Sequence, residues 1–398
     1  MKSRTPLHLR LIAVLLLLLI SGAVGTGPLS AQSVAQRRAV EAFADSIAPV
    51  SDTAFLLALE TKLMTAARRD RANPAAHLTL GQLALRLGHF DDAASEFKWA
   101  TQLEPQWPYP WFGLGIAEFG AGTDKSAARD GRRALLGRDA WTRAAAAWTR
   151  AVTLEPAFAG RLERLGHTAL ARGDRDQATV IREALRRASA PPRSGHPVGA
   201  VVLARARFER ELGDTASALA VFETVTWEDG RAQALLEQAR VRFVTAAGDG
   251  SEPYYAGARL DDSIVVAQYR RDLTWIATPA ELAEFDHAAG PDRAEFLWSF
   301  WTGRDRQALR ASGDRLREHY RRLELAARQF EGDSLDSSDP RVAVWIRHGA
   351  PEDRITGSVA GVVPNETWRF KRARGDLVLH FGARAPGGYA VLPTLLDL

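Results

Sequence analysis

The residue run with the clearest capacity for chemistry is Arg347-His348-Gly349, near the carboxyl end of this chain of 398 residues. An imidazole can attack phosphorus as a nucleophile, and a neighbouring guanidinium can hold phosphoryl oxygens through paired hydrogen bonds. Residues 341–347 alternate aliphatic side chains with other types, a period of two that predicts a half-buried strand. The sequence therefore predicts an arginine and a histidine together at a strand end.

The run resembles the phosphohistidine motif of the histidine phosphatases, whose site also requires a large α/β domain after the motif, a second histidine and an acid. Here His380 is the only histidine that follows, and it lies between Leu379 and Phe381 in another apolar run. That setting is typical of a packed or sheet-edge histidine. An enzymatic activity is therefore the less favoured interpretation.

A turn is the simpler interpretation of residues 347–353, because Gly349 and the proline two positions later are turn-forming residues. A binding role stays open. Arg347, His348 and Arg354 would form a cationic pocket at the sheet edge if their side chains converge.

Several classes of catalytic and metal site are missing from the sequence. There is no cysteine, which excludes disulfides, a thiolate nucleophile and Cys-bound zinc. The His-Glu-x-x-His, phosphate-loop and Gly-x-Ser-x-Gly motifs do not occur either. Because His77, His89 and His167 are scattered, we expect them to be solvated or hydrogen-bonded imidazoles, and we expect no metal and no cofactor.

A helix-pair repeat is visible in residues 80–105. Its small and large side chains recur at Leu80-Gly81, Ala84, Gly88, Phe90, Ala93, Phe97, Ala100 and Pro105. This spacing resembles the tetratricopeptide (TPR) repeat, and Asn73-Pro74 supplies a start for its first helix. Such a pair cannot bury its apolar face alone, so it must stack on neighbours in an array.

Weaker units follow the first. The second has Trp111, Leu114 and Gly115 in its first helix, but its second helix comes only after residues 120–138. We interpret that insertion as a loop or short extra helix on one rim of the array. The third unit ends at the two prolines 191–192, and a fourth follows from residue 199.

Beyond the array the period changes from helical to alternating. Strands are predicted at residues 341–347, 367–371, 376–381 and 389–392, with a hairpin turn at 372–375. The predicted fold class is α+β, an all-α TPR solenoid followed by a smaller domain of helices and antiparallel sheet. The expected divisions are a signal peptide (1–31), a helical cap (32–72), the repeat array (73–230, with the insertion at 120–138), a helical connector (231–256) and the α+β domain (257–398).

Four tryptophans of the last domain, Trp298, Trp301, Trp345 and Trp368, are a candidate platform for stacking on a carbohydrate. Their spacing instead favours a core in which they meet between helix and sheet.

The carboxyl-terminal third, roughly residues 255–398, resembles the GWxTD domain, a family of secreted bacterial proteins often joined to TPR repeats. The matching phrases are Phe300-Trp301, Arg304-Asp305, Glu318-His319-Tyr320-Arg321-Arg322, Asp339-Pro340-Arg341, Trp345-Ile346-Arg347-His348-Gly349-Ala350-Pro351, Glu366-Thr367-Trp368-Arg369-Phe370 and Gly388-Tyr389. The name-giving Gly-Trp-x-Thr-Asp is replaced by residues 336–340. The family has no established activity, so the resemblance implies a domain boundary and a compartment and leaves the mechanism open.

The first residues have the pattern of a secretory signal peptide. Basic side chains at Lys2, Arg4 and Arg10 precede an apolar run at residues 11–20, and Leu29-Ser30-Ala31 offers a cleavage site of the small-residue type. An uncleaved anchor is the alternative, although residues 11–24 fall short of the roughly 20 needed to span a bilayer. We expect an exported protein of the periplasm, cell envelope or extracellular space, with no transmembrane span after cleavage.

Charge excludes one class of partner. The net charge of the chain is +4, and the predicted signal peptide contributes three of its basic residues. In the rest of the chain arginines and acidic residues are interspersed, as in residues 172–176. A nucleic-acid surface would need a basic stripe that follows phosphates. We therefore expect a protein or peptide partner and no nucleic acid.

The first helices of stacked pairs present their side chains to a groove, and the repeat phase selects seven residues for it. They are Leu78, Gln82, Arg86, Phe112, Ile116, Glu163 and His167. The sequence thus predicts an interaction or assembly scaffold. The alternatives are an array that only holds the last domain, or a hydrolase or glycan-binding site in that domain. The sequence leaves the partner and the oligomeric state unspecified.

The phosphatase interpretation has a direct test, phosphate-ester turnover by the wild type and by His348→Ala. We expect no turnover in either protein, because the second histidine and the acid are not supplied. Turnover by the wild type that is lost in the variant would restore the enzyme interpretation.

Overall fold

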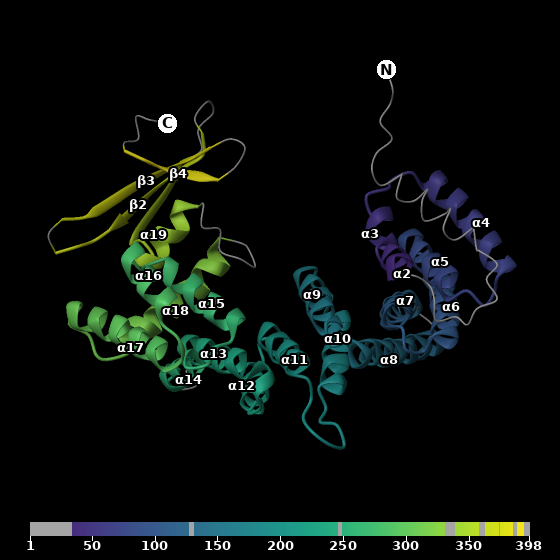
Figure 1. Ribbon diagram of the computed structural model, residues 1–398. Helices are drawn as coiled ribbons and strands as arrows, with labels where there is room; N and C mark the ends of the chain where they lie inside the picture. Colours follow the sequence, from purple (N-terminus) through teal and green to yellow (C-terminus); the bar gives the residue numbers. More distant parts are fainter. Residues whose placement is uncertain are drawn as a thin grey trace. The chain divides into compact units, whose positions relative to one another are not determined.

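The computed structural model describes residues 34–126, 131–245, 249–330, 339–357, 363–373, 375–384 and 388–393 (Figure 1). Contacts divide the chain into two compact units, Met1–Val221 and Phe222–Leu398. The predicted signal peptide lies outside the described residues. The predicted α+β class is confirmed, because helical pairs precede a small antiparallel sheet.

The first unit is a stack of helix pairs. Its elements are α2 Val34–Glu41, α3 Phe43–Ile47, α4 Thr53–Arg69, α5 Pro74–Leu87, α6 Phe90–Leu103, α7 Pro108–Ser126, α8 Gly131–Leu154, α9 Phe158–Ala171, α10 Arg175–Ala188, α11 Gly199–Glu211 and α12 Thr215–Glu223, which spans the division. Within pairs, α5 contacts α6, α7 contacts α8 and α9 contacts α10; along the stack, α5 contacts α7 and α9 contacts α11. This nearest-neighbour pattern is that of a TPR-like solenoid.

The ends of α5 follow from the local sequence. The side-chain oxygen of Asn73 accepts hydrogen bonds from the backbone N–H groups of Ala75 and Ala76 at 3.1 and 3.2 Å. Pro74 occupies the first turn, where its missing N–H costs nothing. Gly88, at φ 77°, ends the helix in the left-handed conformation that glycine adopts without strain.

Glycines on the first helices let aromatic rings of neighbouring helices approach the backbone. Phe97 of α6 lies against both Gly81 of α5 and Gly113 of α7, where an added Cβ atom would be 2.8 and 2.5 Å from its ring carbons. Trp148 fills the same kind of space at Gly115. Successive helices are therefore joined by rings that replace absent side chains.

The prediction that residues 120–138 form a loop is wrong. α7 continues to Ser126 and α8 begins at Gly131, so the described part of the segment lengthens the second pair. Gly120, the first residue of this segment, lies inside α7 against Phe90. Residues 132–136 are arginine, alanine and leucine, all good helix formers.

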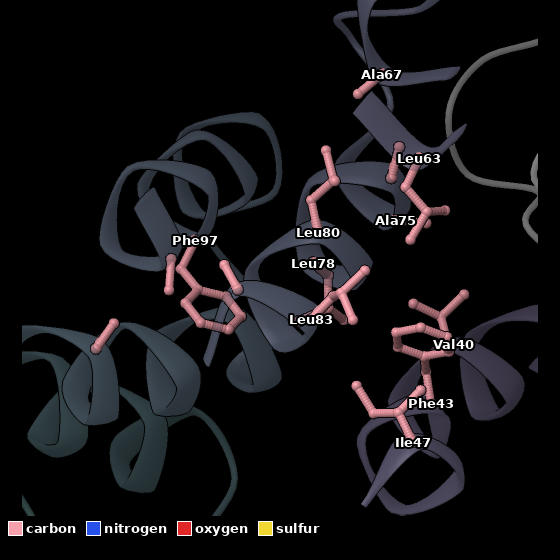
Figure 2. Close-up of a cluster of buried hydrophobic side chains, with 14 of the residues drawn as sticks. Val40, Phe43, Ile47, Leu63, Ala67, Ala75, Leu78, Leu80, Leu83 and Phe97 are labelled. Carbon is pink, nitrogen blue, oxygen red and sulfur yellow. The ribbon is translucent and has the colours of Figure 1, made fainter. Parts of the chain in front are cut away.

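The described residues 34–72 of the predicted helical cap (32–72) form three helices. One buried cluster contains Val40 of α2, Phe43 and Ile47 of α3, and Leu78 and Leu83 of α5. Figure 2 shows these side chains turned toward one another. The helix α4 packs on α5 as well. This amino-terminal segment therefore belongs to the core of the first unit.

In the described part of the second unit, seven helices come first, and most of them surround an aromatic core. They are α13 Glu228–Val244, α14 Ser251–Ala258, α15 Ser263–Thr274, α16 Pro279–His287, α17 Gly290–Gln307, α18 Asp314–Gln329 and α19 Pro340–His348. Tyr269 Oη donates to the Tyr254 carbonyl at 2.6 Å, and Trp301 Nε1 donates to Tyr254 Oη at 3.1 Å. The buried hydroxyl and indole groups are thus satisfied inside the core.

The sheet is an antiparallel meander in the order β1-β2-β3-β4. Its strands are β1 Asp353–Gly357, β2 Asn365–Phe370, β3 Leu377–Ala383 and β4 Tyr389–Leu392. The predicted last three strands and the hairpin between β2 and β3 are confirmed. The sequence does not predict β1, because its polar side chains are mostly exposed and show no apolar alternation.

The strand predicted at residues 341–347 is wrong, because this segment is the helix α19. Asp339 Oδ1 accepts from the Arg341 N–H at 2.9 Å, and Pro340 occupies the first turn. Val342 and Ile346, four residues apart, are the buried pair. A short apolar run fits either period, and the Asp-Pro start is the signal that decides it.

The tryptophans meet only in part as predicted. Trp345 and Trp368 pack edge to face between α19 and the sheet, with ring centroids 5.9 Å apart. Trp301 lies instead in the helical core, and Trp298 is 51% exposed. Two rings of the suggested carbohydrate platform, Trp301 and Trp368, are buried and cannot stack on a ligand.

None of the helices in the described parts of the chain is both long enough and apolar enough to cross a membrane.

The contacts between rings and glycines predict that two glycine-to-alanine substitutions change the free energy of unfolding in opposite directions. Gly113→Ala should lower the free energy of unfolding by about 1–2 kcal/mol, because overpacking costs about 1–3 kcal/mol and the gain in helix propensity is smaller. In the control Gly160→Ala, the nearest contact of the added Cβ would be Arg164 at 3.7 Å. This variant should gain up to about 1 kcal/mol. Denaturant unfolding measures both, and midpoints that move in the same direction would contradict the packing argument.

Candidate functional site

A cavity of about 400 Å³ lies in the first unit on the face formed by the first helices of the repeats. Helix α5 contributes Leu78, Gln82 and Leu85, α7 contributes Tyr109, Phe112, Gly113 and Ile116, α9 contributes Arg161, and α6 contributes Phe97. The opposite wall comes from the amino-terminal helices and the residue between them, with Arg38, Glu41, Ala42, Ala44 and Asp45. The α2–α3 segment thus forms one side of the groove.

Four of the seven predicted groove residues line this cavity. They are Leu78, Gln82, Phe112 and Ile116. The first helices bring them together because residues at successive turns of α5 and α7 face the same side.

The other three predicted groove residues contact this chain elsewhere. Arg86 Nη2 donates to the Val50 carbonyl at 2.6 Å, which ties α5 to the link between α3 and α4. Glu163 and His167 of α9 lie 3.8 and 3.6 Å from charged side chains of α11. Their role in binding stays a prediction.

The floor of the cavity is apolar, with one polar atom of particular interest. The side-chain oxygen Oε1 of Gln82 is buried and has no hydrogen-bond partner among the described residues. A buried acceptor without a partner costs about 1–3 kcal/mol. A ligand that brings an N–H group to this point would remove that cost.

The rim carries charges of both signs. Glu41 accepts a hydrogen bond from Trp107 Nε1 at 2.8 Å. The Arg161 guanidinium lies over the rings of Tyr109 and Phe158, 4.9 and 4.8 Å from their centroids. Burial is the main reason that the pKa of Tyr109 lies above its usual value, so its hydroxyl stays neutral. The rim is therefore of mixed charge, and both Glu41 and Arg161 contact neighbouring aromatic side chains.

The spacing of the repeat did not predict that α2 and α3 form one side of the groove, because these helices precede the recognisable repeat. The signal that was available is the apolar spacing of Val40, Phe43 and Ile47, which needs a partner face. Tyr109 and Arg161 were missed because their contact is made between successive helix pairs.

The three carboxyl-terminal candidates have three different sets of partners. Arg347 Nε donates to the Trp275 carbonyl at 2.7 Å. His348 packs on Phe370 and lies 3.0 Å from an Arg372 nitrogen, and its pKa is lowered by burial and by nearby arginines. Arg354 is paired with the buried carboxylate of Glu366 at 2.8 Å.

The Arg-His-Gly run ends a helix, not a strand as predicted. His380 lies on β3, where its Nδ1 is 2.9 Å from the Thr367 hydroxyl. Among the residues that the structure describes, there is no cluster of three or more acids and histidines suited to a metal ion.

Comparison with known proteins gives partial likenesses to TPR proteins of solved structure. A thermophilic TPR protein of Thermus thermophilus, TTC0263, is 21% identical, with 52% of this chain and 91% of that chain covered and a TM-score of 0.27. MamA is 16% identical over 48% of this chain and 92% of that chain, with a TM-score of 0.25. No protein-family model and no curated protein matches the sequence. The GWxTD resemblance stays a prediction, and the helix pairs of the chain itself carry the TPR-like assignment.

His77 joins the two helices of the first clear repeat and gives a pH-dependent prediction. Its Nδ1 lies 2.6 Å from Glu96 Oε2 and its Nε2 lies 3.1 Å from the Arg71 carbonyl. Because both neighbours are acceptors, the imidazolium form is favoured, and the hydrogen bond to Glu96 raises the pKa of His77 above 6.5.

The stabilising contribution of His77 is complete below the unfolded-state pKa and is lost as the pH rises through the folded-state pKa. The difference in unfolding free energy between wild type and His77→Gln should therefore shrink as the pH rises above about 6.5. Chemical unfolding from acid to alkaline pH measures it, with Glu96→Gln as a background in which the trend is reduced, because the largest cause of the raised pKa is removed. A difference that stays constant with pH would rule out the pairing.

Proposed function

We propose that this protein is an interaction scaffold whose repeat groove binds an extended segment of a protein partner. The observation that carries the proposal is the cavity of about 400 Å³ on the first helices, with an apolar floor and the amide oxygen of Gln82, which has no hydrogen-bond partner within the described ranges.

The cavity chemistry fits a peptide better than a small metabolite. Its volume lies within the range of about 300–1,000 Å³ of ligand pockets. A peptide supplies both an apolar side chain for the floor and a backbone N–H for Gln82 Oε1. The mixed charges of Arg38, Asp45 and Arg161 favour selection by shape and hydrogen bonding over net charge.

Two further elements of the proposal rest on sequence. The basic, apolar and small-residue pattern of residues 1–31 supports export to the periplasm, cell envelope or extracellular space. The GWxTD resemblance supports the same setting and assigns no reaction to the second unit. We propose that the partner is met outside the cytoplasm.

The test compares a groove glutamine with a matched glutamine on an outer helix. Partners are captured with the wild-type protein, their bound segment is mapped, and its affinity is measured by calorimetry. Gln82→Ala should weaken binding about threefold to tenfold, because one hydrogen bond is worth about 0.5–1.5 kcal/mol. Ile116→Arg should abolish binding, because it places a charge on the apolar floor.

The control is Gln102→Ala, which removes an exposed glutamine from α6 and should leave the affinity unchanged. Circular dichroism confirms that each variant is folded. Equal affinity in all three variants would remove the groove from the proposal.

A further inference from the structure

The second unit contains a cavity of about 360 Å³ whose lining is strongly cationic. Arg304 of α17, Arg315 and Arg322 of α18 and Arg347 of α19 line it, and Glu318 is the single carboxylate among the described lining residues. We propose that this cavity binds inorganic phosphate as the doubly charged hydrogen phosphate ion.

The guanidinium group of Arg304 is fixed by neighbouring side chains. Arg304 Nη2 donates to both carboxylate oxygens of Glu281 at 3.0 and 3.1 Å, and its plane lies over the Phe300 ring. Glu281 is itself fixed by the capping box with Thr278 at the start of α16. The position of Arg304 is therefore set before any ligand arrives.

The α18 arginines share one acid. Glu318 accepts from Arg315 at 2.8 Å and from Arg310 at 2.6 Å, and it is also paired with Arg322. One carboxylate cannot neutralise three guanidinium groups. Burial lowers the pKa of Arg322, which shows the cost of desolvating a cation that an anion would stabilise.

Arg322 also offsets the negative end of α19. Its Nη1 donates to the carbonyls of Ile346 and Arg347 at 3.2 and 2.7 Å. Those terminal carbonyls would otherwise repel an anion at this wall.

Arg347 has donors to spare. Its Nε is bonded to the Trp275 carbonyl at 2.7 Å, and no other described residue pairs with its guanidinium. The terminal nitrogens remain available for a bidentate contact with an oxyanion.

His319 supplies the independent observation that points to a ligand. It lines the cavity, is only 4% exposed, and its Nε2 lies 3.0 Å from the Asp272 carbonyl, which requires Nε2 to carry the proton. Burial lowers the pKa of His319 to about 4, so the ring is neutral and Nδ1 is an acceptor. That Nδ1 is buried and has no hydrogen-bond partner among the described residues.

A ligand that satisfies both the arginines and this acceptor would be an anion that also donates a hydrogen bond. Hydrogen phosphate carries two negative charges and one O–H group, which meets both requirements. Sulfate has the same shape and charge and no O–H group. At about pH 8, methyl phosphate also carries two negative charges and no O–H group, because the second pKa of a phosphomonoester is about 6.

Among these residues, only Arg347 was a candidate binding residue from the sequence alone. The signal for the rest is the spacing of Arg315, Glu318, His319 and Arg322, which places them on one face of α18. Their convergence with Arg304 and Arg347 depends on how α17, α18 and α19 pack.

The proposal is tested on the full chain at about pH 8 by calorimetric titration with phosphate, sulfate and methyl phosphate. Phosphate should bind at least about tenfold more tightly than either anion that lacks the O–H group. Arg347→Gln should weaken phosphate binding by about tenfold or more, because it removes charge-assisted contacts. The exposed Arg306 of the same unit does not line the cavity, and Arg306→Gln should leave the affinity unchanged.

His319→Phe removes the acceptor and should make phosphate and sulfate equivalent. If this variant does not fold, the anion ratio and the Arg347 comparison decide alone. No phosphate binding at millimolar concentration, equal binding of phosphate and sulfate by the wild type, or an unchanged affinity in Arg347→Gln would overturn the proposal.

Discussion

The first unit depends on the contact between an aromatic ring and the missing side chains of glycine. Phe97 touches the positions of two glycines, Gly81 in its own pair and Gly113 in the next, so one ring sets two helix spacings. Because packed interiors do not absorb an extra methyl group without a shift, this contact fixes how closely α5, α6 and α7 approach. Phe97 and Gly113 also line the groove cavity, so the same packing that holds the stack together shapes the candidate peptide site.

The second unit depends on a buried polar arrangement around Asp272. Its Oδ2 accepts from Arg240 Nη2 and from the Tyr320 hydroxyl, each at 2.8 Å, and its backbone carbonyl lies 3.0 Å from His319 Nε2. The helices α13, α15 and α18 are joined by these bonds, since removing one partner would leave a buried charge or hydroxyl unpaired. The arrangement also selects the His319 tautomer, which leaves Nδ1 as a buried acceptor with no partner among the described residues.

The two cavities differ in the physics by which they would select a ligand. The groove has an apolar floor, one amide acceptor and a rim of both charges, which suits a peptide recognised by shape and hydrogen bonding. The second cavity has four guanidinium groups and a neutral imidazole, which suits a small protonated oxyanion. A chain built in this way would combine a protein contact in one unit with a small-molecule contact in the other.

The local features of the fold were readable from sequence alone. Asn73-Pro74 marks the start of α5, the small and large residues of 80–105 predict the helix pair, and the hairpin of β2 and β3 follows from alternation, because each of these depends on neighbours in the chain. The helix α19 and the lengthened α7 and α8 were mispredicted, since short apolar runs and isolated glycines fit more than one structure until their packing partners are known. Tertiary structure alone decided that α2 and α3 wall the groove and that arginines from α17, α18 and α19 face one cavity. The physical reason is that charge and burial at a site are sums over side chains distant in sequence, and only packing brings those side chains together.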